Sequence, residues 1–140
     1  MKKSEYFKLE ELLKSDTALA AQIENLPAWE DVASLEDLAV NVLDPIRRAW
    51  GQPLVVTSGF RSPQLNAAVG GVPTSAHMEG CAVDVVLPYW STRKVSELYN
   101  LIQWLVESGA IDIDQVIYYR KKKMIHISND IPCRKQFIVK

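Results

Sequence analysis

The chain has 140 residues, of which 48% are hydrophobic and 24% are charged, and its formal net charge is −1. This composition is typical of a soluble globular protein, and we expect residues 1–140 to form a single domain with its own core. A general nucleic-acid-binding protein would usually be strongly basic, so the charge argues against a nucleic-acid partner. We also expect the protein to be a monomer.

The N-terminal residues 1–7 contain two lysines but no apolar run after them, so they lack the core of a secretion signal. No stretch is apolar for long enough to span a bilayer, and we expect no membrane partner. As written, the sequence predicts a cytoplasmic protein unless another factor releases it. Two cysteines, Cys81 and Cys133, do not make a disulfide framework, and we interpret Cys81 as a small core residue.

The clearest helical periodicity lies before residue 51. Ser34 and Asp37 are spaced as in a capping box, and the apolar residues that follow predict a helix that ends at Gly51. Pro45 lies inside this segment and is expected to kink or interrupt it near Asp44, because proline removes a hydrogen bond and clashes with the preceding turn.

Strands are predicted on either side of a second long helix. Residues 53–59 are predicted to form a buried strand, and a turn leads from it into a short helix at about residues 64–69. An amphipathic helix is predicted over residues 95–105 and stops at Gly109. The C-terminal part predicts a hairpin of strands 115–119 and 124–128, and a final apolar run is a candidate edge strand: Phe137-Ile138-Val139.

The stretch Ser75-Ala76-His77-Met78-Glu79-Gly80-Cys81-Ala82-Val83-Asp84 places a histidine and a carboxylate across a glycine. Gly80 permits a turn, and residues 81–86 are an apolar run of strand length. Asp84 then stands among small apolar neighbours, where an ionised carboxylate is costly unless it is paired or bound to a metal. His77 and Asp84 would supply two ligands of a metal site. The alternative is a loop histidine followed by an aspartate that caps or pairs with another group.

The second histidine of the chain, His126, alternates with Ile125 and Ile127 in the last predicted hairpin strand. Its imidazole therefore points to the face opposite those isoleucines. His77, Asp84 and His126 make a two-histidine, one-carboxylate set with an open position, which suits zinc, although non-haem iron uses the same ligand types. Taken alone, His126 would be interpreted as a surface histidine on a hairpin, but together with the Ser75 to Asp84 motif it is interpreted as a ligand.

Together these motifs resemble the zinc D-alanyl-D-alanine carboxypeptidase family of peptidoglycan peptidases, in subfamily A of the M15 peptidases, which shares its fold with the amino-terminal signalling domain of hedgehog proteins. The resemblance implies an α+β fold, with helices packed on a small antiparallel central sheet. It rests on these segments, in order: Phe7-Lys8-Leu9-Glu10-Glu11-Leu12, Ser15, Asn25-Leu26-Pro27, Leu43-Asp44-Pro45-Ile46-Arg47, Ser58-Gly59-Phe60-Arg61-Ser62-Pro63, Asn66, Gly70-Gly71, Ser75 to Asp84, Asp114-Gln115-Val116-Ile117 and Ile125-His126-Ile127-Ser128.

By this resemblance, the metal ion is zinc and its ligands are His77, Asp84 and His126. Arg61 is the cationic residue that faces the substrate carbonyl or carboxylate, and a guanidinium there can stabilise charge that develops on the oxygen. The simpler reading of Arg61 is that it caps a loop. Further candidates for substrate contacts are Ser75, Gln115 and Tyr118.

The chain departs from the family at the general base. Many members carry a carboxylate three residues before the last histidine, and here that position is Lys123. The acid could come from elsewhere, with Asp114, Glu79 and Asp112 as candidates in that order. Otherwise the hairpin register is shifted, or the protein is a weak or inactive zinc-binding relative.

The leading hypothesis is a zinc metallopeptidase that hydrolyses the peptide stem of peptidoglycan in the cell wall. It would act as a D-Ala-D-Ala carboxypeptidase or as a stem endopeptidase, and a phage or prophage endolysin is one possible setting. The rival is a non-enzymatic zinc-binding module that binds cell-wall peptide or a protein partner. The run Arg120-Lys121-Lys122-Lys123 is interpreted as a solvated hairpin turn rather than a patch for anionic polymers.

Overall fold

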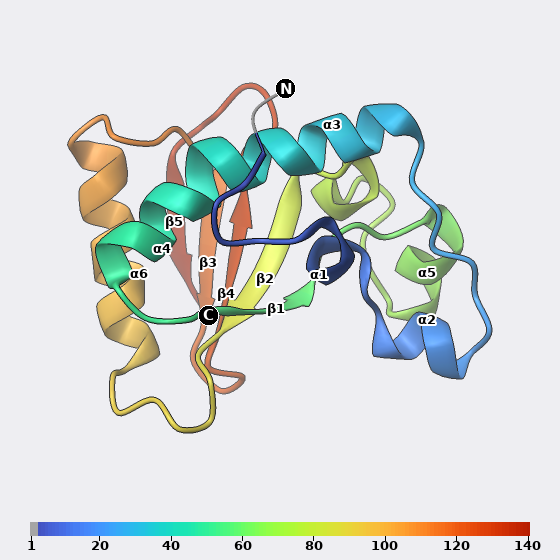
Figure 1. The fold of residues 1–140 in the computed structure, drawn as a ribbon, viewed down its shortest axis with the longest axis horizontal. Coiled ribbons are helices and arrows are strands. Elements are labelled where there is room, and N and C mark those ends of the chain that lie inside the picture. Colours follow the sequence, from blue (N-terminus) through green and yellow to red (C-terminus); the bar gives the residue numbers. More distant parts are fainter. Residues whose placement is uncertain (1–2) are drawn as a thin grey trace.

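A computed structural model describes residues 3–140, in which helices pack on one five-stranded sheet, and this confirms the α+β class (Figure 1). Met1 and Lys2, which begin the N-terminal segment discussed above, lie outside the described residues. Across the described chain, no helix combines the length and apolarity needed to span a bilayer. The helical elements are α1 (Leu9–Leu13), α2 (Asp16–Ala20), α3 (Trp29–Leu38), η1 (Ala39–Leu43), α4 (Asp44–Trp50), α5 (Pro63–Ala68), η2 (Ala76–Glu79) and α6 (Val95–Glu107), and the strands are β1 (Val55–Ser58), β2 (Ala82–Val86), β3 (Gln115–Tyr119), β4 (Met124–Ser128) and β5 (Gln136–Val139).

The strands lie in the order β1-β2-β4-β3-β5. The first four are antiparallel, as predicted, whereas β5 pairs parallel with β3. The predicted edge strand at residues 137–139 is confirmed as β5, but it does not share the antiparallel direction predicted for the sheet. Its position follows from connectivity, because β4 already occupies one edge of β3. Residues 129–135 carry the chain past the end of β3 to its free edge, where it runs in the same direction as β3.

The long helical segment begins earlier than the sequence pattern predicts. Helix α3 starts at Trp29, and the backbone N–H of Ala28 donates to the Asp31 carboxylate at 2.9 Å. The capping box assigned to Ser34 and Asp37 is wrong, since Asp37 instead accepts a hydrogen bond from a side chain one turn later in the segment. An acid that reaches back to the first turn stabilises a helix start without a Ser or Thr cap.

The predicted interruption near Asp44 is present as a change of helix type. The five residues of η1 form a π-helical turn immediately before α4, and Pro45 lies in the first turn of α4. A wider turn fits here because Pro45 has no N–H to donate into the preceding helix. Gly51 ends α4 with a φ of 79°, as expected for a helix-terminating glycine.

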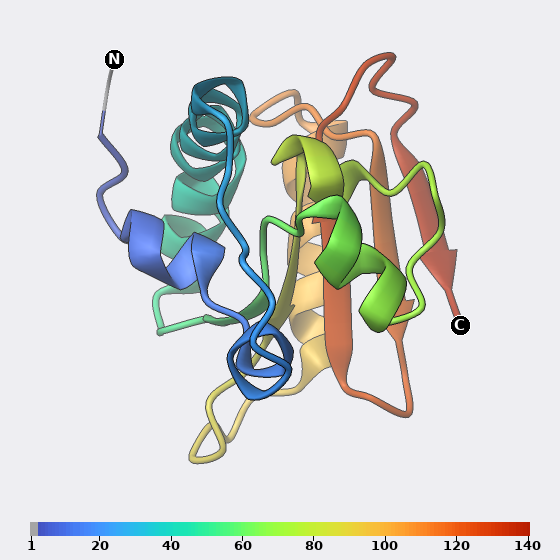
Figure 2. The ribbon, with the colours of Figure 1, turned by 90° about the vertical axis from the view of Figure 1, so that its right-hand side faces the viewer.

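The core lies between the sheet and the helices α3, α4 and α6, which cover one face of it (Figures 1 and 2). Strand β1 is an edge strand that is partly exposed, with Val55 at 42%, so the prediction of a buried strand at this position is wrong. The fully buried side chains of this core include Leu35, Leu38, Val42, Ile46, Val83, Leu98, Ile102, Val116, Ile125 and Ile127.

The opposite face of the sheet carries the predicted metal ligands. Asp84 in β2 lies directly opposite His126 in β4. His77 comes from the short helix η2, which packs beside β2, and Figure 2 shows α5 and the loop after it on this side of the sheet. Gly80 ends η2 with a φ of 72°, and a Cβ there would collide with the backbone carbonyl of Asp31. Glycine at this position therefore fixes how η2 enters β2.

Candidate metal centre

Three ligand atoms, one each from His77, Asp84 and His126, lie within 4.8 Å of one another. The two imidazole rings are 5.2 Å apart between centroids and tilted by 57°. Strand alternation brings Asp84 and His126 to one face, and the turn at η2 folds His77 over them. The structure therefore brings together all three residues that the sequence predicts as ligands.

The environment of His77 fits a metal ligand. Its Nδ1 lies 2.7 Å from the carbonyl oxygen of Gly59, which can only accept, so Nδ1 carries the proton and donates. Its Nε2 is buried and has no hydrogen-bond partner among the described residues, and it lies 3.4 Å from Asp84 Oδ1. Buried polar atoms normally have a partner. A histidine fixed by a backbone carbonyl, with its other nitrogen unpartnered and aimed at a carboxylate, is the arrangement that metal ligands use.

Asp84 connects the two histidines to the rest of the cleft. Its Oδ1 lies 2.9 Å from His126 Nδ1. Burial raises the pKa of the Asp84 carboxyl, but the interactions with His126 and His77 outweigh burial and hold that pKa well below its usual range. Asp84 is therefore ionised at neutral pH, the form that binds a cation. Two imidazoles and one carboxylate match the donor set of catalytic zinc.

Arg61 lies beside this group and is held in place by three side chains. Its guanidinium donates to Ser58 Oγ at 3.2 Å and to Asn66 Oδ1 at 3.2 Å, and its Nη2 lies 3.5 Å from Asp84 Oδ2. Burial lowers the pKa of Arg61 and the charge of Asp84 opposes this, but arginine remains charged at neutral pH. A Cβ on Gly71 would collide with Asn66, so this glycine leaves room for the Arg61 support.

A cleft of about 550 Å³ opens over the three ligands, and its lining residues can be compared with the predicted substrate contacts. Arg61, Ser75 and Gln115 line it. Tyr118 does not line this cleft. It lies on the opposite face of β3, where its ring is 5.7 Å from that of Tyr99 in α6. The prediction of Tyr118 as a substrate contact is therefore wrong, because side chains alternate along a strand.

The three acids considered for the general base lie in different surroundings. Asp114 lines the cleft, but both of its oxygens are held by Arg134, whose Nε and Nη2 donate at 2.9 and 2.8 Å. Glu79 is exposed and does not line the cleft. Asp112 is also exposed, and its nearest ion-pair partner is Lys135 at 3.7 Å. The geometry disfavours all three as the proton acceptor at the metal.

The ion pair between Arg134 and Asp114 indicates a structural role for Asp114. The side-chain hydrogen bond from Arg134 holds the pKa of Asp114 below its ordinary value. A lowered folded-state pKa contributes stability above about pH 4, and this contribution is lost as the pH falls through the folded-state value. Asp114→Asn should therefore lower the free energy of unfolding by about 1–3 kcal/mol at pH 7, and the difference should narrow at about pH 3, in urea denaturation.

The exposed Asp112→Asn serves as the matched control and should unfold like the parent protein at both pH values. The structural role is contradicted if Asp114→Asn has parental stability and its hydrolysis of substrate no longer depends on a deprotonated acid. Asp114 would then be the general base.

Several residues of the cleft were missed by the sequence reasoning, among them Tyr119, Asp130 and Arg134. Tyr119 shares its face of β3 with Ile117, which lies opposite His126, so the strand register would have found it. Burial raises the pKa of the Tyr119 phenol, and so does the charge of Asp84, while Arg61 opposes them. The phenol is therefore protonated at neutral pH and can donate a hydrogen bond. No sequence signal marked Asp130, which follows β4.

An α+β sheet that presents two histidines, a carboxylate and an arginine in one cleft is the framework of a metal-dependent hydrolase. The family model described as Peptidase M15 matches residues 5–128, and the chain belongs to this family of zinc peptidases. Among curated proteins, none matches the sequence. The family is zinc-dependent in general, which agrees with the donor set of His77, Asp84 and His126.

Proposed function

We propose that this protein is a zinc-dependent peptidase that hydrolyses the peptide stem of peptidoglycan. The observation that carries the proposal is the unpartnered Nε2 of His77, which faces Asp84 and His126 in a cleft that also holds Arg61. Membership of the peptidase M15 family supports a peptide substrate of the cell-wall type. The reaction would be D-Ala-D-Ala carboxypeptidase or stem endopeptidase activity, and the cell wall would be the site of action, as for a phage endolysin.

In this proposal, His77, Asp84 and His126 would hold the zinc ion. Zinc in such a site lowers the pKa of bound water toward neutrality and polarises a carbonyl group. The Gly59 carbonyl keeps the proton of His77 on Nδ1, so that Nε2 stays available as a ligand. Arg61 places a fixed positive charge at the edge of the site, where it can stabilise negative charge on the substrate oxygen.

A second candidate is the non-catalytic module, which would bind zinc and cell-wall peptide without cutting it. Two observations favour it. Lys123 stands where many relatives carry an acid, and it does not line the cleft. Asp114 does line the cleft, but both of its oxygens are bound by Arg134.

Hydrolysis of defined muropeptides separates these two candidates. The purified protein is loaded with zinc and incubated with muropeptides near neutral pH, and the products are separated by mass spectrometry. The proposed peptidase releases D-alanine or cuts within the stem, and chelation should stop the reaction until zinc is restored. Intact muropeptides after incubation with protein of verified zinc content would contradict the peptidase and favour the module.

A further inference from the structure

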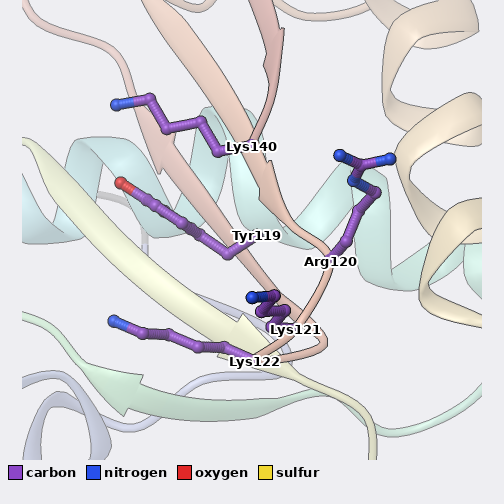
Figure 3. Close-up of a pocket in the computed structure, with 5 residues that line it drawn as sticks. All are labelled: Tyr119, Arg120, Lys121, Lys122 and Lys140. Carbon is purple, nitrogen blue, oxygen red and sulfur yellow. The ribbon is translucent and has the colours of Figure 1, made fainter.

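Two lysines flank the ring of Tyr119. The Nζ atoms of Lys122 and Lys140 lie 5.5 and 5.9 Å from the ring centroid. Figure 3 shows the three side chains extending in the same direction, with Tyr119 between the lysines, while Arg120 extends away from them. Backbone hydrogen bonds fix this arrangement, because Lys140 N donates to Tyr118 O at 2.9 Å and Arg120 N donates to Lys140 O at 3.0 Å.

These three side chains belong to the cleft that contains the metal ligands. Lys122, Tyr119 and Lys140 line it together with His77 and His126. They also line an adjoining hollow of about 520 Å³, which Figure 3 shows. Residues 120–123 form the exposed hairpin turn that the sequence predicts, and Lys122 extends from this turn along the cleft.

The strand register gives the distance of this group from the metal ligands. Ile117 lies opposite His126, and Tyr119 lies two residues further along β3, opposite Met124. Two residues of a strand span about 7 Å, which is also the length of about two residues of an extended peptide. A peptide in the cleft with one bond at the metal ligands would therefore bring a group about two residues away next to Tyr119.

The two lysines also differ from the arginines of the cleft in their charge balance. Arg61 is paired with Asp84, and Arg134 is paired with Asp114. Within residues 3–140, neither Lys122 nor Lys140 has a carboxylate within ion-pair distance of its ammonium group. This end of the cleft thus carries two ammonium groups that form no ion pair with a side chain of residues 3–140, and a phenol that can donate a hydrogen bond.

We propose that Lys122, Tyr119 and Lys140 form a subsite that binds a carboxylate of the peptide substrate, about two residues from the bond that is cut. This inference rests on the proposed function, since a peptide substrate supplies the carboxylate. Two ammonium groups and a phenol provide charge-assisted hydrogen bonds to both carboxylate oxygens. The protein should therefore discriminate between peptides that differ only by a carboxylate and a carboxamide.

The test measures binding without turnover. The probes are a synthetic stem pentapeptide with free glutamyl and C-terminal carboxylates, and two forms in which one or the other carboxylate is amidated. Their dissociation constants are measured by calorimetry on the metal-free protein. One of the two amidations should weaken binding by about tenfold, the effect of losing one charged hydrogen bond. In Lys122→Gln and in Lys140→Gln, the ratio of the dissociation constants of the amidated and free-acid peptides should fall to about two.

Lys121→Gln is the matched control, because Lys121 lies in the same turn but does not line the metal cleft, and it should keep the full ratio. The proposal is overturned if the parent protein binds none of the peptides or binds all three equally. It is also overturned if Lys122→Gln and Lys140→Gln both keep the parental ratio of dissociation constants. Hydrolysis of the same peptides by the zinc-loaded protein is assayed separately. Discrimination without hydrolysis would leave the subsite standing and refute the peptidase.

Discussion

His77→Ala should reduce bound zinc from about one ion per chain to less than about one tenth, because one of three protein ligands is lost. Hydrolysis of muropeptides should fall by about a thousandfold or more, since the activated water depends on the metal. The fold should persist, because His77 is not part of the hydrophobic core cluster and, within residues 3–140, its imidazole makes one hydrogen bond, to the carbonyl of Gly59. Losing that bond should cost about 1–3 kcal/mol of stability.

Zinc content is measured by atomic emission on dialysed protein, and the fold is followed by far-UV circular dichroism. Glu79→Gln is the matched control, since Glu79 lies in the same short helix, is exposed and does not line the cleft. It should keep both zinc and activity. A folded His77→Ala protein with stoichiometric zinc would refute the ligand assignment, and loss of activity in Glu79→Gln would make Glu79 the general base.

Arg61→Gln should lower kcat/KM by about 100-fold to 1,000-fold while zinc stays bound, because one preorganised donor to a developing oxyanion is removed. Asp84 keeps its contact with His126 in this variant, so the metal ligands remain assembled. Arg61→Lys should recover only part of the loss, since a single ammonium group cannot reproduce the contacts to both Ser58 and Asn66. Steady-state kinetics on a muropeptide, with zinc content measured in parallel, checks both variants.

Arg48→Gln provides the control for this series. Arg48 makes an exposed ion pair with Glu5, and neither residue lines the cleft, so the loss of Arg48 should leave kinetics and zinc content unchanged. The role of Arg61 is contradicted if Arg61→Gln retains parental kcat/KM, or if its activity falls only in proportion to lost zinc. The second outcome would make Arg61 a support for Asp84 rather than a group that acts on the substrate.

The metal ligands could be predicted from the sequence because local rules fix the face on which each side chain lies, through the turn at Gly80 and the alternation along two strands. The pairing of β2 with β4, which brings Asp84 opposite His126, joins residues 42 positions apart, and it was expected from the family pattern. Arg61 could be expected beside them from the family pattern. Its support by Asn66 depends on a loop that closes over α5, and no local pattern shows this contact.

Errors arose where the outcome depended on the register or on long-range pairing. Choosing Tyr119 rather than Tyr118 requires knowing that Ile117 lies opposite His126, and the length of the hairpin turn does not fix this alone. The pairing of Asp114 with Arg134 joins residues 20 positions apart. It depends on a loop in which Cys133 and Lys135 adopt left-handed backbone angles, φ 58° and 55°. Propensity gives no signal for such angles in these residue types.

The most direct test of the account is a crystal structure of the zinc-loaded protein with anomalous data collected on both sides of the zinc edge. We predict one strong anomalous peak, which marks a zinc ion bound by His77 Nε2, Asp84 Oδ1 and His126 Nδ1, with Arg61 beside it. A zinc ion bound elsewhere, or the absence of a peak between these side chains in protein of verified zinc content, would contradict the account.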